Sequence, residues 1–114
     1  EHLPKICSFS AKWQPDTVYY RHTVPVVPAP ITAELEARIR EVALRVFKLF
    51  DLRGYARIDM RVKNGRPYVI DVNPNPDLSR DAGLALAAGR AGIVFERLVA
   101  GLCAGALYRH RQGR

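Results

Sequence analysis

The sequence has few of the features that would place it in a special class of proteins. It has no run of about 18 apolar residues, because Arg90, Glu96 and Arg97 interrupt even the Ala-rich and Leu-rich C-terminal stretch. We therefore expect no membrane span. It also lacks a signal-peptide pattern at its start. These two absences favour a cytoplasmic setting.

Cysteine and histidine are also scarce. The two cysteines, Cys7 and Cys103, are far apart, lie in apolar contexts and form no CxxC motif. We expect buried free thiols, which argues against zinc binding and redox chemistry. His2, His22 and His110 have no partner at metal-ligand spacing, and we assign them no role.

Acidic residues are outnumbered, with 11 against 18 basic residues and a net charge of +7. The basic residues gather between positions 38 and 53 and in a basic tail over 109–114. We interpret them as a solvated helix face and tail, and such a surplus also attracts nucleotide phosphates. Neither a recognition helix nor aromatics interleaved with basic residues on a strand platform is evident, which argues against nucleic acid as a partner.

Length and composition predict one globular domain over residues 1–114. With 48% apolar residues, the chain is large enough for a modest core, or it is part of something larger that folds. The pattern predicts a strand over 6–12, then a long irregular segment rich in proline with a short extended piece over 18–20.

Three amphipathic helices are predicted from apolar residues at helical spacing. They cover about 32–51, with Thr32 as the N-cap, about 81–89, capped by Ser79 or Asp81, and about 93–108. A hairpin over about 55–73 lies between the first two. The predicted fold is α+β, with an antiparallel sheet whose central hairpin packs against these helices.

The hairpin is the most informative stretch, because two alternating runs meet at Asn64-Gly65. A two-residue loop mixes acids with aliphatics on both faces. A three-residue loop of Lys63, Asn64 and Gly65, with Gly65 in a G1 bulge, pairs Val62 with Arg66 and makes one face almost wholly apolar. We therefore predict the three-residue loop.

In that register the polar face carries Arg57, Asp59, Asp71 and Asn73. Arg57 lies opposite Asp71, and Asp59 is a diagonal neighbour of Asp71. Carboxylate and amide oxygens suit magnesium, and an arginine beside them neutralises a phosphoryl group. The alternative is a surface hairpin whose charges simply pair across the strands, Arg57 with Asp71. Both interpretations stay open on spacing alone.

Four motifs occur in a fixed order along the chain: Ala11-Lys12-Trp13, Gly54-Tyr55-Ala56-Arg57-Ile58-Asp59, Asp71-Val72-Asn73-Pro74-Asn75-Pro76, and Asp81-Ala82-Gly83 with the Ala-rich helix after it. Together they resemble the C-terminal part of ATP-grasp ligases, most closely the D-alanine:D-alanine ligase-like group. The resemblance covers about residues 5–105, nearly the whole chain. Several motifs in the right order are more specific than any one of them.

The resemblance implies a role for each matched residue. Asp59, Asp71 and Asn73 would hold Mg²⁺ (or Mn²⁺) that bridges ATP phosphates. Arg57 would stabilise the acyl phosphate and the tetrahedral intermediate, and Lys12 would contact the transferred phosphate. The implied reaction is ATP-dependent phosphorylation of a small-molecule carboxylate, followed by attack of an amine on the acyl phosphate.

Three positions depart from the family pattern. Asp71 replaces the usual glutamate, which leaves open whether one or two ions bind. Asp77 follows Pro76 where the D-alanine ligases carry glycine, and Ala82 replaces a serine that holds the second D-alanine. We therefore expect a relative with a different acceptor.

The largest departure is the absence of the other lobes that hold ATP in this superfamily. Glu1 is an improbable natural start, so we interpret the chain as the C-terminal fragment of a larger enzyme, inactive alone, whose partners are its own N-terminal lobes. Two alternatives stay open: a basic nucleic-acid-binding module, and a catalytically dead interaction domain that forms a homodimer.

Overall fold

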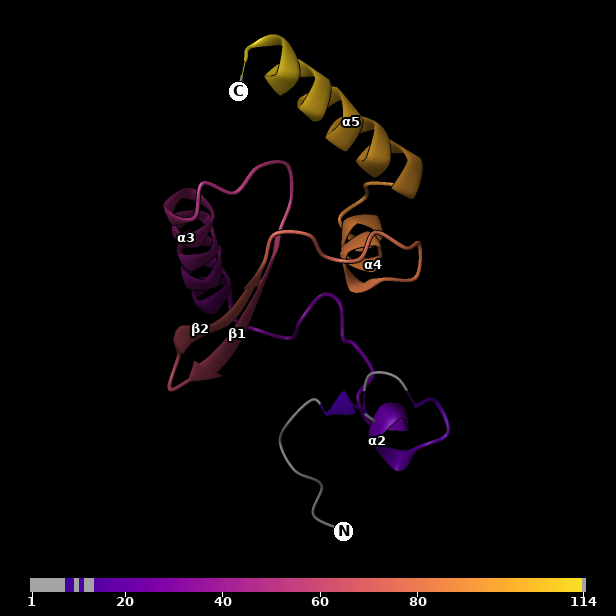
Figure 1. The fold of residues 1–114 in the computed structure, drawn as a ribbon. Helices are drawn as coiled ribbons and strands as arrows, with labels where there is room; N and C mark the ends of the chain where they lie inside the picture. The colour runs from indigo at the N-terminus through magenta and orange to yellow at the C-terminus, as the bar shows by residue number, and fades with distance from the viewer. Residues whose placement is uncertain (1–7, 10, 12–13, 114) are drawn as a thin grey trace.

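The computed structural model describes residues 8–9, 11 and 14–113. Its helices are α2 (Val18–Arg21), α3 (Ala33–Leu49), α4 (Gly83–Arg90) and α5 (Phe95–Arg111), and its strands are β1 (Arg57–Lys63) and β2 (Arg66–Asn73). The strands form an antiparallel two-stranded sheet in this part of the chain. Helix α3 packs against β2, and α4 packs against α5 (Figure 1). This confirms the α+β class and the three main helices.

Helix α3 begins where its cap residue predicts. The Thr32 side chain accepts a hydrogen bond from the Leu35 backbone N–H at 3.3 Å, and Glu34 and Glu36 complement the helix dipole in the first turn. Beyond the helix, Gly54 takes a φ of +75° that favours glycine and directs the chain into β1. The helix therefore places the hairpin directly after it.

The N-terminal part differs from the prediction. Residues 18–20 are helical in α2, not extended, because the Thr17 hydroxyl caps the turn by accepting from the Tyr20 N–H at 3.2 Å. Most of the strand predicted over 6–12 lies outside the described residues. Phe9 and Ala11, which are described, are helical and not extended.

The two C-terminal helices are separated at Gly92, which has a φ of +81°. The predicted cap of α4 is wrong: the N-cap is Ala82, whose methyl side chain can make no hydrogen bond, and the Ser79 hydroxyl is bonded to Asp77. Helix α5 continues to Arg111 and so includes part of the predicted basic tail. Within the described residues no single helix has the length and hydrophobicity of a membrane span. Helices α4 and α5 reach that length and hydrophobicity only when taken together, and they are bent by 106° at the break between them.

The described chain covers little of its apolar surface. Its radius of gyration is 16.3 Å, against about 13 Å for a compact domain of about 100 residues. The buried hydrophobic residues in the described ranges are Ala11 and Ala85, and Leu49 on α3 is 80% exposed. Cys103 is exposed as well, so its predicted burial is wrong, while Cys7 lies outside the described residues. The modest core expected from composition is not assembled by these residues.

Candidate functional site at the end of the hairpin

The hairpin turn is a two-residue loop, which corrects the predicted three-residue loop. Asn64 and Gly65 have φ values of +51° and +69°, and Lys63 pairs directly with Arg66. Positive φ at both central positions matches the strand twist, and Asn-Gly adopts it at low cost. Gly65 is therefore the second residue of the turn and not a G1 bulge.

A bulge further along the strands restores the polar face. Met60 pairs with Val69 but Asp59 pairs with Asp71, so Ile70 is the extra residue in β2. Beyond the bulge Arg57 lies opposite Asn73, not Asp71, and Asp59 lies directly opposite Asp71, not diagonal to it. Directly opposed residues share a face. The four polar residues thus lie together, as predicted, by a different route.

Nearer the turn the faces are exchanged, because the three-residue loop predicts Tyr68 on the apolar face and Val69 on the polar one. Tyr68 lies opposite Arg61 on the polar face, and Val69 lies opposite Met60 on the apolar one. The reason is that this segment precedes the bulge, so its register still follows the two-residue loop.

Asp59 and Asp71, hereafter the acid pair, are bridged by one guanidinium group. Arg57 donates from Nε to Asp59 Oδ1 at 2.8 Å and from Nη2 to Asp59 Oδ2 at 3.2 Å. The same Nη2 lies 3.7 Å from Asp71 Oδ2. The Asp59 and Asp71 side chains are 37% and 56% exposed, so ligands from solvent reach both. The main partner of Arg57 is therefore Asp59 on its own strand, whereas the alternative interpretation of the sequence expected Asp71 on the other strand.

The fourth polar residue is oriented by the loop that follows β2. Asn73 Oδ1 accepts a hydrogen bond from the Asn75 backbone N–H at 2.9 Å, and Asn75 Oδ1 accepts one from the Tyr55 hydroxyl at 2.9 Å. Neither Tyr55 nor Asn75 has a role predicted from the sequence. The bond between Asn73 and Asn75 has a visible signal, since an asparagine side chain such as that of Asn73 readily accepts from the backbone N–H two residues later.

The loop continues through buried Pro76 to a second hydrogen-bonded turn. The Ser79 hydroxyl and backbone N–H donate to Asp77 Oδ1 at 2.6 and 2.8 Å, and these bonds hold the pKa of Asp77 below its ordinary value. Arg80 then pairs with Glu96 at 2.8 Å and stacks on the Phe95 ring, which ties the loop to α5. The pKa of Glu96 is lowered mainly by a hydrogen bond from its own backbone N–H, and further by the hydrogen bond and positive charge of Arg80.

The donor set fits a hard cation that shares its ligands with phosphates. Across residues 8–9, 11 and 14–113, no three His, Cys, Asp or Glu side chains gather into a metal-sized group. The acid pair and the Asn73 amide would instead offer two carboxylates and one neutral oxygen to an ion such as Mg²⁺, which takes one or two carboxylates and completes its shell with phosphates and water. Lys12 lies outside the described residues, so its predicted place beside this site is not seen.

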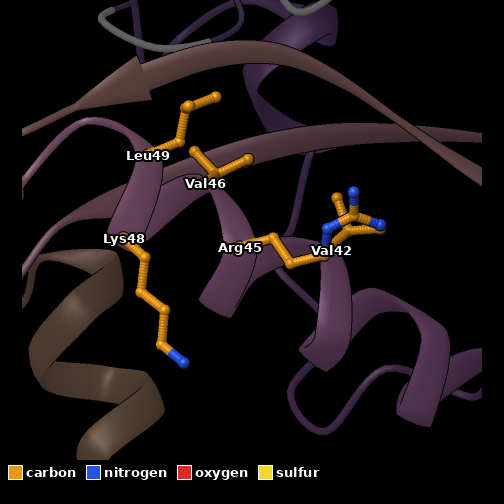
Figure 2. A pocket seen from close by; sticks show the side chains of 5 residues that line it. All are labelled: Val42, Arg45, Val46, Lys48 and Leu49. Carbon is orange, nitrogen blue, oxygen red and sulfur yellow. The ribbon is translucent and has the colours of Figure 1, made fainter.

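A separate groove of ≈ 550 Å³ runs along α3. Figure 2 shows the residues that line it: Val42, Arg45, Val46, Lys48 and Leu49. None of these belongs to the polar face of the hairpin. The groove is apolar with a basic edge. Such a lining suits contact with another protein segment better than it suits a catalytic site.

Comparisons with known proteins agree on one family. The family described as D-ala D-ala ligase C-terminus matches residues 5–104. A D-alanine–D-alanine ligase of Dichelobacter nodosus is 37% identical over 84 residues, which cover 73% of this chain and 27% of that protein. An uncharacterized protein y4sG of Sinorhizobium fredii is 34% identical over 76 residues, covering 66% and 23%.

Solved structures show the same likeness in three dimensions. The crystal structure of a D-alanine–D-alanine ligase from Bacillus anthracis complexed with ATP matches with a TM-score of 0.75 and 35% identity, over 82% of this chain and 32% of that one. The chain thus spans about a quarter to a third of the length of these relatives. Sequence, fold and motif order agree, and the chain belongs to the D-alanine–D-alanine ligase C-terminal family of the ATP-grasp superfamily.

Proposed function

We propose that this chain is the C-terminal, phosphate-handling part of an ATP-dependent ligase that joins a carboxylate to an amine. The observation that carries the proposal is the acid pair directly opposed across the hairpin and bridged by Arg57, in a member of this family. The ATP bound by the Bacillus anthracis relative supports nucleotide as the second substrate.

Asp59, Asp71 and Asn73 would hold Mg²⁺ or Mn²⁺, which neutralises phosphate charge when bound. Arg57 lies within 4 Å of both carboxylates, and it would exchange these partners for phosphoryl oxygens if a cation took its place. It then stabilises negative charge on the transferred group. The role proposed for Lys12, contact with the transferred phosphate, rests on the family resemblance.

The reaction has two steps. A carboxylate oxygen attacks the γ-phosphorus of ATP, ADP leaves, and an acyl phosphate forms. The amine then attacks the acyl carbon, the tetrahedral intermediate expels phosphate, and the nitrogen loses a proton. Positioning and charge neutralisation by Arg57 and the cation supply most of the catalysis in such a sequence.

The uncovered apolar surface supports a further part of the proposal. This chain covers only 27–32% of these relatives' own length, and the α3 groove with Leu49 is exposed. We propose that preceding lobes of the same enzyme cover such faces and complete the ATP site, so residues 1–114 alone turn over no ATP. A homodimer through the same faces predicts a mass that depends on concentration. A cytoplasmic location stays a prediction.

The test uses the polypeptide that the gene encodes and measures Mg²⁺-dependent release of ADP in the presence of candidate carboxylates and amines. We expect Asp59→Asn and Asp71→Asn each to lower the rate at least 100-fold. Asp51→Asn is the matched control, because Asp51 is an exposed aspartate that pairs with Arg53 at 2.9 Å away from the sheet. Equal rates in all three variants would contradict the proposal, as would ATP turnover by residues 1–114 alone.

A further inference from the structure

Two hydrogen bonds connect the entrance of β1 to the exit of β2. The Tyr55 hydroxyl donates to Asn75 Oδ1 at 2.9 Å, and the Asn75 backbone N–H donates to Asn73 Oδ1 at 2.9 Å. Tyr55 precedes Arg57 by two residues and Asn75 follows Asn73 by two, so the connection flanks the Arg57–Asn73 pair at the end of the sheet. Neither Tyr55 nor Asn75 belongs to the acid pair.

The connection constrains the one neutral group in the proposed donor set. An amide oxygen has two lone pairs, and the Asn75 N–H occupies one of them. The terminal torsion of an unrestrained asparagine is broad, so this bond selects one orientation of the Asn73 amide and leaves the second lone pair for another partner. Mg²⁺ and similar ions tolerate little deviation from their preferred geometry, so an oriented oxygen is a better ligand than a rotating one.

The position of Asn75 depends on the loop that carries it. Asn75 lies between Pro74 and Pro76 in the sequence, and Pro76 is buried. The bond from Tyr55 adds a side-chain tether from the opposite strand. Removing the Tyr55 hydroxyl leaves the aromatic ring and its packing in place but releases the Asn75 side chain.

We propose that Tyr55 and Asn75 are positioning residues that orient Asn73 as a cation ligand. This inference rests on the proposed function, in which Asn73 contacts the cation. Tyr55 and Asn75 touch neither the cation nor the phosphates, and act only through the Asn73 amide. Loss of one such hydrogen bond is expected to weaken cation binding about 2-fold to 10-fold.

The test measures binding of Mn²⁺, in the presence of ATP, to the polypeptide that the gene encodes, with free Mn²⁺ quantified by electron paramagnetic resonance. We expect Tyr55→Phe and Asn75→Ala each to raise the Kd for Mn²⁺ about 2-fold to 10-fold. Tyr68→Phe is the matched control, since it removes a tyrosine hydroxyl from the same hairpin on the far side of the bulge. We expect it to leave the Kd unchanged.

A second background separates positioning from a general structural role. In Asn73→Ala the amide is gone, so Tyr55→Phe should cause no further loss of Mn²⁺ binding. An unchanged Kd in Tyr55→Phe, or the same loss with and without Asn73, would overturn the inference while Asp59→Asn still abolishes binding. If Asp59→Asn leaves Mn²⁺ binding intact, the proposed function itself fails, and this inference fails with it.

Discussion

Replacing Arg57 with glutamine removes the cation that lies between the two carboxylates of the acid pair. The guanidinium group is 2.8 Å from Asp59 and 3.7 Å from Asp71, so it competes with any metal ion for the same oxygens. A unit charge about 4 Å away acts with about 1 kcal/mol in a water-like medium, and half-exposed ion pairs measure about 0.2–1 kcal/mol. Without nucleotide, Arg57→Gln should therefore bind Mn²⁺ up to about fivefold more tightly.

With substrates present the same substitution should act in the opposite direction. Arg57 is then needed to neutralise phosphoryl charge, and loss of such a group costs about 10²-fold to 10³-fold in rate. The assay combines Mn²⁺ titration without nucleotide with release of ADP under turnover. Arg53→Gln serves as the control, because Arg53 pairs with Asp51 outside the hairpin. Weaker Mn²⁺ binding by Arg57→Gln without nucleotide would refute the competition between the guanidinium group and the cation.

Two further predictions concern the loop and the turn. Ser79→Ala removes the hydroxyl bond to Asp77, so the pKa of Asp77 measured by NMR titration should rise toward its ordinary value, whereas Ser79→Thr should keep it low. Because folding lowers this pKa, its stabilising contribution is present above about pH 4 and is lost as the pH falls through the lowered value; an unchanged pKa in Ser79→Ala would exclude Ser79 as the cause. Gly65→Ala should lower the free energy of unfolding by about 1–2 kcal/mol, because Gly65 has a φ of +69°. Gly83→Ala, at an ordinary φ with open space around it, should be neutral or stabilising by up to about 1 kcal/mol in the same denaturation experiment, and equal effects at both glycines would contradict this reasoning.

The helices were predictable because their signals are local. Apolar residues at helical spacing and the Thr32 cap lie within a few residues of the backbone that they organise, so α3 begins where expected. Predictions failed where two local preferences compete. Residues 18–20 contain β-branched and aromatic side chains that favour a strand, but the cap provided by Thr17 favours a helical turn. At Ser79, the bond to Asp77 took the hydroxyl that was expected to cap α4.

The sequence alone determined that Arg57, Asp59, Asp71 and Asn73 share a face, and which family the chain resembles. A face depends only on alternation by twos, so a two-residue loop followed by one extra residue, Ile70, yields beyond the bulge the same face as the predicted three-residue loop. The tertiary structure decided which residue lies opposite which, because pairing depends on where the extra residue sits, and that is set by contacts between strands. It placed Asp59 against Asp71, closed Arg57 onto both carboxylates, and linked Tyr55 to Asn75 across 20 residues of sequence.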